Sequence, residues 1–394
     1  MKSKWIISIT AGWAQTHSIK RCKEMGFNVL SVDENPNAVG FKFSDEYLVS
    51  KIDDLDKIIN YVDTKKITPS GIIGFVSDAA IIPVGMLREY FQLPSQNLDL
   101  LQTQIDKERL IDLLKNNEIK IPDSFVITDF EDSKNLFKNI DTPFISKPTF
   151  GSGSRGVNKI ETKNELKKIK DSFLFSKNNR IIIQEFIKGE ELSIETFCHK
   201  KEVEFLAISK REINDALSAT DIFTYEVDKY ISLIISKEIE KIYKIFEYPD
   251  GPGHFELILD KNSNIKIIDV HFRGGGFDIY NYLVKEVSGF DIVRNTIMQC
   301  LNHKINLNYD KEKNSVYIKF LSGHKGVLKK IDGIEGVKKM GKVKMKTFYE
   351  IGEKIHHNNS DSERIVMLTC IDENIDSCKK LINEAVKKIN IKIQ

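Results

Sequence analysis

A lysine followed closely by a glycine-rich loop is the feature of this sequence that most directly predicts chemistry. Lys147 lies in a strand-like run that begins at Pro143. The loop after it is made of small residues, namely Gly151, Ser152, Gly153, Ser154 and Gly156. Glycines let backbone N–H groups approach an anion with no Cβ in the way, and a nearby lysine adds positive charge. The segment therefore predicts a loop that holds the phosphates of a nucleotide, and hence ATP-driven chemistry.

The spacing Gly-x-Gly-x-x-Gly also occurs in dinucleotide-binding folds and in protein kinases, so the neighbouring sequence has to decide between them. A dinucleotide loop opens directly into a helix. Here the loop runs into the strand-like Val157–Ile160, and helix signals begin only at the capping box Thr162–Glu165. A Walker Gly-Lys-Ser/Thr and the kinase His-Arg-Asp and Asp-Phe-Gly motifs are missing from the sequence. The pattern favours a glycine flap between two strands, with a simple hairpin turn as the alternative.

The next segments could serve a nucleotide and a cation. Residues 181–194 form a strand, a polar hinge, a glycine turn and a second strand. The hinge can offer main-chain groups to an adenine edge, and Glu191 can hydrogen-bond ribose hydroxyls. Further on, Glu256 and Asp269 each stand in an apolar, strand-like run. Because an unpaired buried carboxylate is costly, two of them on adjacent strands predict a shared cation.

Taken in order, these elements resemble the ATP-grasp superfamily, in its branch of amino-acid ligases and biotin-carboxylase-like proteins, over nearly the whole chain. Members of that superfamily use ATP to activate a carboxylate as an acyl phosphate and then couple it to a nucleophile. A further sign is Asp106-Lys107 at the start of an amphipathic helix, with Ile121-Pro122 behind it. The resemblance implies an ATP site made of Lys107, Lys147, the flap residues Gly151 to Gly156, Gln184, Glu185 and Ile187 at the adenine, and Glu191 at the ribose.

The resemblance also implies catalytic roles and a metal site. Lys147 and Arg273 are implied to be catalytic, and Glu256 and Asp269 to bind Mg²⁺. In the family, the second carboxylate is usually Glu followed two residues later by Asn, whereas this chain has Asp269 and His271. Because Mg²⁺ prefers oxygen ligands, His271 as a direct ligand would suit Mn²⁺ or a single-metal site. The alternative is that His271 is a hydrogen-bonding partner beside the site.

Substrate contacts are expected at two places. Arg273, followed by Gly274 and Gly275 in a flexible turn, is implied to face the transferring phosphoryl group or a substrate carboxylate. Asp78 follows the apolar run Ile72–Val76, at the edge where open α/β sheets place ligands. Asp78 could therefore meet an amine, and an N-cap for the next helix is the alternative.

The predicted fold is a multidomain α/β and α+β chain. A Rossmann-like domain precedes the ATP-grasp domain and spans residues 1–97. The ATP-grasp domain spans 98–303, with a glycine-flap lid over about 122–187. An α+β domain spans 304–394. The expected strands are Trp5–Ile9, Asn28–Val32 and a third parallel strand at Ile72–Val76, then 315–320, 326–331, 342–348 and 364–370 before a helix at Ile375–Ile389. His356-His357 is expected to flank an ordinary turn.

Composition is consistent with a soluble enzyme. The 394 residues include 59 Lys+Arg and 57 Asp+Glu, so no broad electrostatic surface for nucleic acid is expected. No apolar stretch has the length of a membrane-spanning helix, and the run Trp5–Ile9 is expected to be the first strand, not part of a signal peptide. Five cysteines without a C-x-x-C spacing are typical of reduced thiols in a cytoplasmic protein.

The predicted function is therefore an ATP-dependent carboxylate–amine ligase. It would form an amide bond through an acyl phosphate, releasing ADP and phosphate, from small-molecule substrates that the motifs do not identify. A homodimer is one assembly open to it. Two rivals remain, an ATP-dependent carboxylase of the aminoimidazole-ribonucleotide type and a non-catalytic nucleotide sensor. Retention of Glu256, Asp269 and both lysines argues against the sensor.

Overall fold

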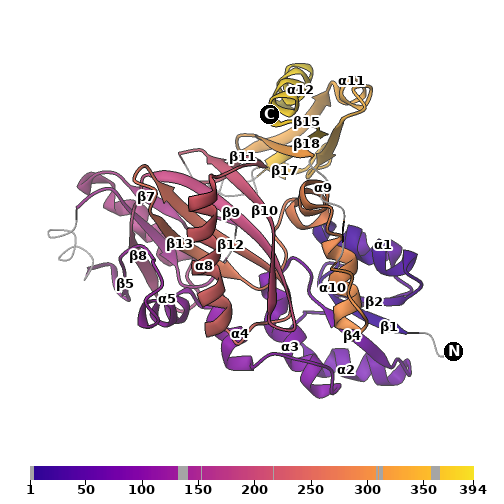
Figure 1. Ribbon diagram of the computed structural model, residues 1–394. Coiled ribbons are helices and arrows are strands. Elements are labelled where there is room, and N and C mark those ends of the chain that lie inside the picture. Colours follow the sequence, from indigo (N-terminus) through magenta and orange to yellow (C-terminus); the bar gives the residue numbers. More distant parts are fainter. Residues whose placement is uncertain are drawn as a thin grey trace.

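The computed structural model describes residues 4–131, 141–151, 153–215, 217–307, 309, 314–355 and 364–394. Within them, the centre of the molecule is an antiparallel sheet in the order β13-β12-β9-β10-β11-β14-β18-β16 (Figure 1). Its strands are β9 (Gly189–His199), β10 (Glu202–Ile213), β11 (Ala219–Thr224), β12 (Gly251–Asp260), β13 (Ile265–His271), β14 (Ser315–Ser322), β16 (Val343–Thr347) and β18 (Arg364–Asp372). The predicted carboxylate strands are β12 and β13, and they are neighbours.

One face of this sheet packs on the long helix α8 (Lys229–Ile245). Ile235 and Ile239 of α8 share a core cluster with Leu192 and Ile194 of β9 and Phe255 of β12. Because side chains alternate along a strand, the residues between these apolar ones point to the opposite face. That face carries Glu191, Ser193 and Glu195 on β9 and His254 and Glu256 on β12. The hydrophobic pattern thus turns a row of polar groups away from the core.

The N-terminal part is a parallel sheet in the order β3-β2-β1-β4. Its strands are β1 (Trp5–Ile9), β2 (Asn28–Asp33), β3 (Glu46–Val49) and β4 (Pro69–Ile73). The connections run through α1 (Thr16–Glu24), the 3₁₀ helix Val39–Phe43 and α2 (Leu55–Thr64), and α3 (Ile81–Tyr90) follows β4. The first two strands confirm the prediction. The third strand was predicted at Ile72–Val76, but it begins at Pro69 and ends at Ile73. Phe75 adopts a left-handed φ of 39°, which lies outside the β region and so ends the strand before it. The edge strand β3 was not predicted.

A small antiparallel sheet forms the lid, in the order β5-β8-β6-β7. Its strands are β5 (Ser124–Ile127), β6 (Phe144–Pro148), β7 (Asn158–Ile160) and β8 (Ile181–Glu185). The glycine loop joins β6 to β7, as expected. In it, Gly156 has a φ of +71°, and a Cβ there would lie 2.8 Å from the Cβ of Phe175, so both backbone conformation and packing require glycine.

The helix signal after the flap was only partly correct. The segment begins as a 3₁₀ helix, Lys163–Lys168, and becomes α-helical in α7 (Ile169–Phe175). The side chain of Thr162 makes no capping hydrogen bond. Glu165 reaches back, but its Oε2 accepts from the backbone N–H of Glu161, at 2.8 Å. The reciprocal pair of hydrogen bonds that a capping box requires is therefore not formed between Thr162 and Glu165.

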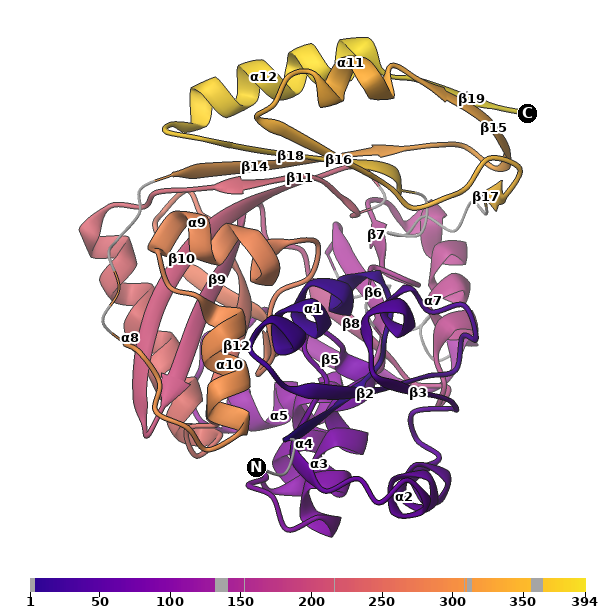
Figure 2. The same cartoon turned by 90° about the vertical axis from the view of Figure 1, so that its right-hand side faces the viewer.

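The C-terminal part contributes to two sheets. β14, β16 and β18 extend the central sheet, while β15 (Gly326–Asp332), β17 (Lys354–Ile355) and β19 (Asn390–Ile393) form another. Figure 2 shows α11 (Ile334–Lys338) and α12 (Ile375–Lys388) along the outer face of these strands. The expected boundary near residue 304 is therefore not a break in the sheet. His356-His357 lies outside the described residues. In the described part of the chain, no helix has both the length and the apolarity needed to cross a membrane.

Candidate active site

A cavity of about 900 Å³ lies where the lid, the central sheet and the N-terminal part meet. Most of the predicted site residues line it, although they come from distant parts of the chain. Those lining it are Asp78, Lys107, Lys147, Gly151, Gly153, Ser154, Gln184, Glu185, Ile187, Glu191, Glu256, Asp269, His271 and Arg273. Gly156, Gly274 and Gly275 are not among the lining residues, and Ser152 lies outside the described residues.

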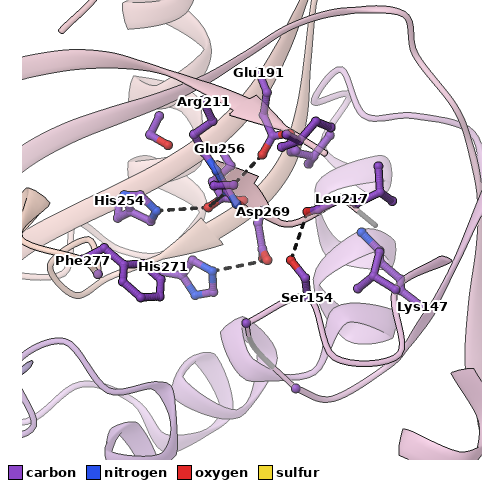
Figure 3. Close-up of a pocket in the computed structure, with 18 of the residues that line it drawn as sticks. Lys147, Ser154, Glu191, Arg211, Leu217, His254, Glu256, Asp269, His271 and Phe277 are labelled. Atoms are coloured by element: carbon purple, nitrogen blue, oxygen red, sulfur yellow. Dashed lines mark hydrogen bonds and ion pairs between the residues drawn. The ribbon is translucent and has the colours of Figure 1, made fainter. Parts of the chain in front are cut away.

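The two predicted metal carboxylates face each other across β12 and β13. Glu256 and Asp269 are register partners, and His254 and His271 form the next pair on the same face. Arg211 donates from Nη1 to Oε1 of Glu256, at 2.5 Å (Figure 3). Burial would raise the pKa of Glu256, but the charges of Arg211 and His254 outweigh it and hold the pKa well below its usual range. Glu256 is therefore ionised throughout the physiological range.

Asp269 is held in the same ionised state from the other side. The Nζ atom of Lys107 contacts its Oδ2, and Lys107 begins α5 (Lys107–Asn116), whose N-cap is Asp106. Burial would raise the pKa of Asp269, but His271 and Lys107 lower it far more. The pair Glu256 and Asp269 thus presents two negative charges, each balanced by a cationic side chain.

These donors fit Mg²⁺ if other oxygens complete its shell. Among the described residues, no group of three or more His, Cys, Asp or Glu side chains is arranged to hold a metal ion. Mg²⁺ is usually bound by one or two carboxylates together with substrate phosphates and water. Oε1 of Glu256 is occupied by Arg211, while Oε2 makes no hydrogen bond within the described part of the chain. A nucleotide would therefore have to supply the remaining ligands.

His271 lies between two carboxylates. Its Nδ1 is 3.1 Å from Oδ1 of Asp78, and its Nε2 is 3.3 Å from Oδ2 of Asp269. Burial would lower the pKa of His271, but these two carboxylates raise it. Both ring nitrogens thus lie within ion-pair distance of carboxylate oxygens, although Nδ1 makes no hydrogen bond among the described residues.

Asp78 and Arg273 are each other's partners. Nε of Arg273 donates to Oδ1 of Asp78 at 2.5 Å and Nη2 donates to Oδ2 at 2.9 Å. The pair connects the turn after β4 to the end of β13, across 195 residues of chain. Asp78 is the first residue of a short 3₁₀ helix (Asp78–Ala80), and Ser77 is its N-cap, so Asp78 is not the helix cap. Asp78 and Arg273, the two residues predicted to contact substrate, are thus paired with each other.

Replacing Asp78 with asparagine is expected to destabilise the fold by about 3 kcal/mol at pH 7, because Arg273 would be left without its counterion in a mostly buried place. Burial opposes ionisation of Asp78, but Arg273 and His271 hold its pKa well below the usual value. That contribution is complete above about pH 4 and is lost as the pH falls through the folded-state pKa. Urea unfolding of both proteins at pH 7 and in acid measures it, and an equal gap at both pH values would contradict the assignment.

Lys147 is buried under the flap. Its Nζ donates to Oε1 of Gln184 at 2.9 Å, and Nε2 of Gln184 donates in turn to Oγ of Ser124 at 3.0 Å. The side chain of Gln184 is therefore engaged on both sides, by Lys147 and by Ser124. Burial, and then the charge of Lys107, lower the pKa of Lys147 to about 8. Burial thus weakens the proton affinity of this lysine, and a neighbouring anion would restore it.

Sequence reasoning missed Arg211, His254 and Glu195. Arg211 is the register partner of Glu191 across β9 and β10, and its Nη1 lies 3.0 Å from Oε1 of Glu191 as well as beside Glu256. No motif marks these residues. Only the alternation of apolar and polar positions along β9, β10 and β12 could have placed them on the face of the cavity.

Comparison with known proteins identifies the class. Residues 105–245 match the family described as ATP-grasp domain. The L-arginine-specific L-amino acid ligase of Bacillus subtilis is 22% identical over 349 residues, which cover 85% of this chain and 84% of that protein. The carbamoyl phosphate synthase large chain of Clostridium botulinum is 25% identical over 336 residues, 79% of this chain. The chain matches only 30% of the length of that synthase.

Solved structures show the same fold. The L-amino acid ligase from Bacillus licheniformis superposes with a TM-score of 0.86 at 19% identity, and all of both chains is covered. The N5-carboxyaminoimidazole ribonucleotide synthetase from Thermotoga maritima gives a TM-score of 0.75 at 17% identity, over 99% of this chain and 100% of that one. These likenesses confirm the predicted fold class, and the relatives named as ligases agree with the predicted enzyme class. Residues 105–245 thus match an ATP-grasp domain, and the chain as a whole shares the fold of these solved structures.

Proposed function

We propose that this chain joins a small-molecule carboxylate to an amine at the expense of ATP, through an acyl phosphate, and releases ADP and phosphate. The observation that carries the proposal is that two lysines, two ionised carboxylates and the flap line one cavity. Relatives named as amino acid ligases match this chain over most of their length. The proposal includes the three domains 1–97, 98–303 and 304–394, a cytoplasmic location and a homodimer.

In this mechanism, the cationic groups at the cavity serve the phosphates. Lys107, Lys147 and the flap amides neutralise charge on the γ-phosphoryl group while the substrate carboxylate attacks its phosphorus and ADP leaves. Glu256 and Asp269 would hold a divalent cation, which would supply further positive charge beside the phosphates when bound. Lys107 and Arg211, which balance the two carboxylates in the free protein, are then available to phosphate oxygens.

Arg273 and the flap act on the second step. The guanidinium of Arg273, fixed by Asp78, holds the acyl phosphate while the amine attacks the acyl carbon and phosphate leaves. Water must be kept out, since it would hydrolyse the intermediate. The flap already reaches across the cavity, because Oγ of Ser154 donates to the carbonyl oxygen of Leu217 at 3.2 Å (Figure 3). This contact lies between the flap and the loop that joins β10 to β11.

The experiment is a screen of amino acids, sugar acids and amines for ADP release, with hydroxylamine present in parallel. The acyl phosphate is expected to be intercepted as a hydroxamate once the right carboxylate is supplied, and AMP is not expected. Bicarbonate-dependent ADP release without an amine-linked product would favour the carboxylase; one neighbour of the same fold is named an N5-carboxyaminoimidazole ribonucleotide synthetase. ATP binding without turnover would favour the sensor, and pyrophosphate release would overturn the proposal.

Lys147 gives nucleotide binding a pH dependence. Its pKa is lowered to about 8 in the free protein, and phosphate charge beside it would raise that value. Binding of ADP or ATP is therefore expected to take up a proton above pH 8, and the affinity to fall as the pH rises further. Calorimetry at pH 8.5 in two buffers of different ionisation enthalpy measures the uptake. Lys147→Met should show none of it, and equal uptake by the variant would assign the proton to another group.

A further inference from the structure

Glu195, His254 and Glu256 form a chain of side-chain contacts, in which His254 lies between the two carboxylates. Glu195 on β9 is completely buried, and its Oε1 contacts Nδ1 of His254, its register partner on β12. The other ring nitrogen of His254, Nε2, lies 3.3 Å from Oε1 of Glu256 (Figure 3). The three side chains come from two adjacent strands and share one face of the sheet. None of them belongs to the flap.

These contacts determine which carboxylate oxygen of Glu256 is left without a hydrogen bond. His254 and Arg211 both contact Oε1. Oε2 makes no hydrogen bond in the described part of the chain and belongs to a side chain that lines the cavity. A carboxylate held through one oxygen presents the other in a fixed direction, which is how groups behind a metal site orient its ligands.

The backbone holds the imidazole in place. A Cβ on Gly275 would lie 2.9 Å from Nδ1 of His254 and 3.0 Å from Oε1 of Glu195, so the main chain at Gly275 covers this contact. The absence of a side chain at Gly275 is thereby explained by packing, without a substrate. Rotation of the His254 ring would require this segment to move.

Stability alone does not account for Glu195. Its Oε2 is buried and has no hydrogen-bond partner among the described protein atoms, and a buried charged oxygen left in this state is costly. An apolar residue would serve a sheet core better at this position. The geometry therefore points to a role for Glu195 in the site that it supports.

We propose that His254 is a positioning residue for Glu256, oriented by Glu195, and that the pair sets the affinity of the chain for a divalent cation bound with nucleotide. The proposal rests on the proposed function only in placing that cation at Glu256. Loss of the contact to Glu256 should weaken cation binding by about 10- to 100-fold, as for other groups that orient metal ligands.

The test is a titration of the full chain with Mn²⁺ in the presence of ADP, followed by electron paramagnetic resonance. His254→Asn keeps an amide near the position of Nδ1 but cannot reach Glu256, whereas His254→Gln places an amide near Nε2. We expect about 10- to 100-fold weaker Mn²⁺ binding for His254→Asn, recovery in His254→Gln, and an intermediate value for Glu195→Gln. Two controls lie away from the cavity: His199→Asn, where His199 contacts Gln299, and Glu238→Gln, another buried carboxylate.

ADP affinity without metal, measured in EDTA, separates positioning from a structural role. It should be unchanged in His254→Asn, and loss of ADP binding in EDTA would overturn the proposal. So would Mn²⁺ affinity within about twofold of the wild-type value in His254→Asn when Glu256→Gln has lost it. If His254→Asn does not fold, Glu195→Gln, which exchanges a single atom, decides by the same criteria. A wild-type chain that binds no Mn²⁺ with ADP would refute the nucleotide site itself, and with it both proposals.

Discussion

Glu256→Gln is expected to reduce ATP turnover by at least about 100-fold, because a divalent cation contributes several kcal/mol to phosphoryl transfer and 1.4 kcal/mol corresponds to a factor of ten. The amide keeps the shape of the side chain and can still accept from Arg211. It lacks the negative charge, which in the wild-type protein is permanent because Arg211 and His254 hold the pKa of Glu256 well below its usual range. The measurement is ADP release as a function of Mg²⁺ concentration.

The control for this variant is Glu202→Gln, an exposed carboxylate at the start of β10. Its turnover should equal that of the wild-type protein. If high Mg²⁺ restored Glu256→Gln to the full wild-type rate, Glu256 would affect only metal affinity. A rate close to wild type at low Mg²⁺ would remove Glu256 from the metal site altogether.

Lys147→Met is expected to lower turnover by about 100- to 1000-fold, equivalent to about 2.7–4 kcal/mol for one charge-stabilising donor lost from a closed site. Methionine fills the space of the lysine stem, so little packing is lost. Turnover within about tenfold of the wild-type rate would contradict the role of Lys147 in phosphate binding.

Lys147→Met should nevertheless be no less stable than the wild-type protein at pH 7. Burial lowers the pKa of Lys147 to about 8, so the folded protein disfavours the lysine charge that the unfolded chain carries freely. Between that pH and about 10.4, the unfolded lysine binds a proton that the folded one has lost. Wild-type stability should therefore rise relative to the variant as the pH increases through this window. Urea unfolding at pH 7 and pH 9.5 measures the difference.

The sequence was most informative where chemistry and structure are local. The flap and its lysine lie within ten residues, and the Glu256 and Asp269 strands form one hairpin, so apolar runs and turn residues sufficed to place them. Pairs that depend on tertiary contact could not be predicted. Asp78 and Arg273 were both named as substrate contacts, but nothing in the sequence shows that they pair with each other.

Other differences follow from the balance of local and long-range forces. Thr162 and Glu165 have the side chains of a capping box, but the segment forms a 3₁₀ helix without a side-chain cap. There, the side chain of Glu165 accepts from the backbone N–H of Glu161. The edge strand β3 buries only Leu48 in its four residues, so it has too little apolar alternation to be recognised. Arg211 and His254 carry no motif, since their role is created by strand register.

The continuity of the central sheet has a mechanical consequence. β14, β16 and β18 are hydrogen-bonded into the same sheet as the strands that carry Glu191, Glu256 and Asp269. The C-terminal part therefore cannot move relative to these carboxylates without breaking backbone hydrogen bonds between strands. In contrast, β5, β6, β7 and β8 form a separate sheet. The cavity would therefore open and close by movement of the lid sheet relative to the central sheet. Amide hydrogens of the lid sheet can then exchange with solvent through local opening, whereas those of the central sheet exchange only when the whole sheet unfolds.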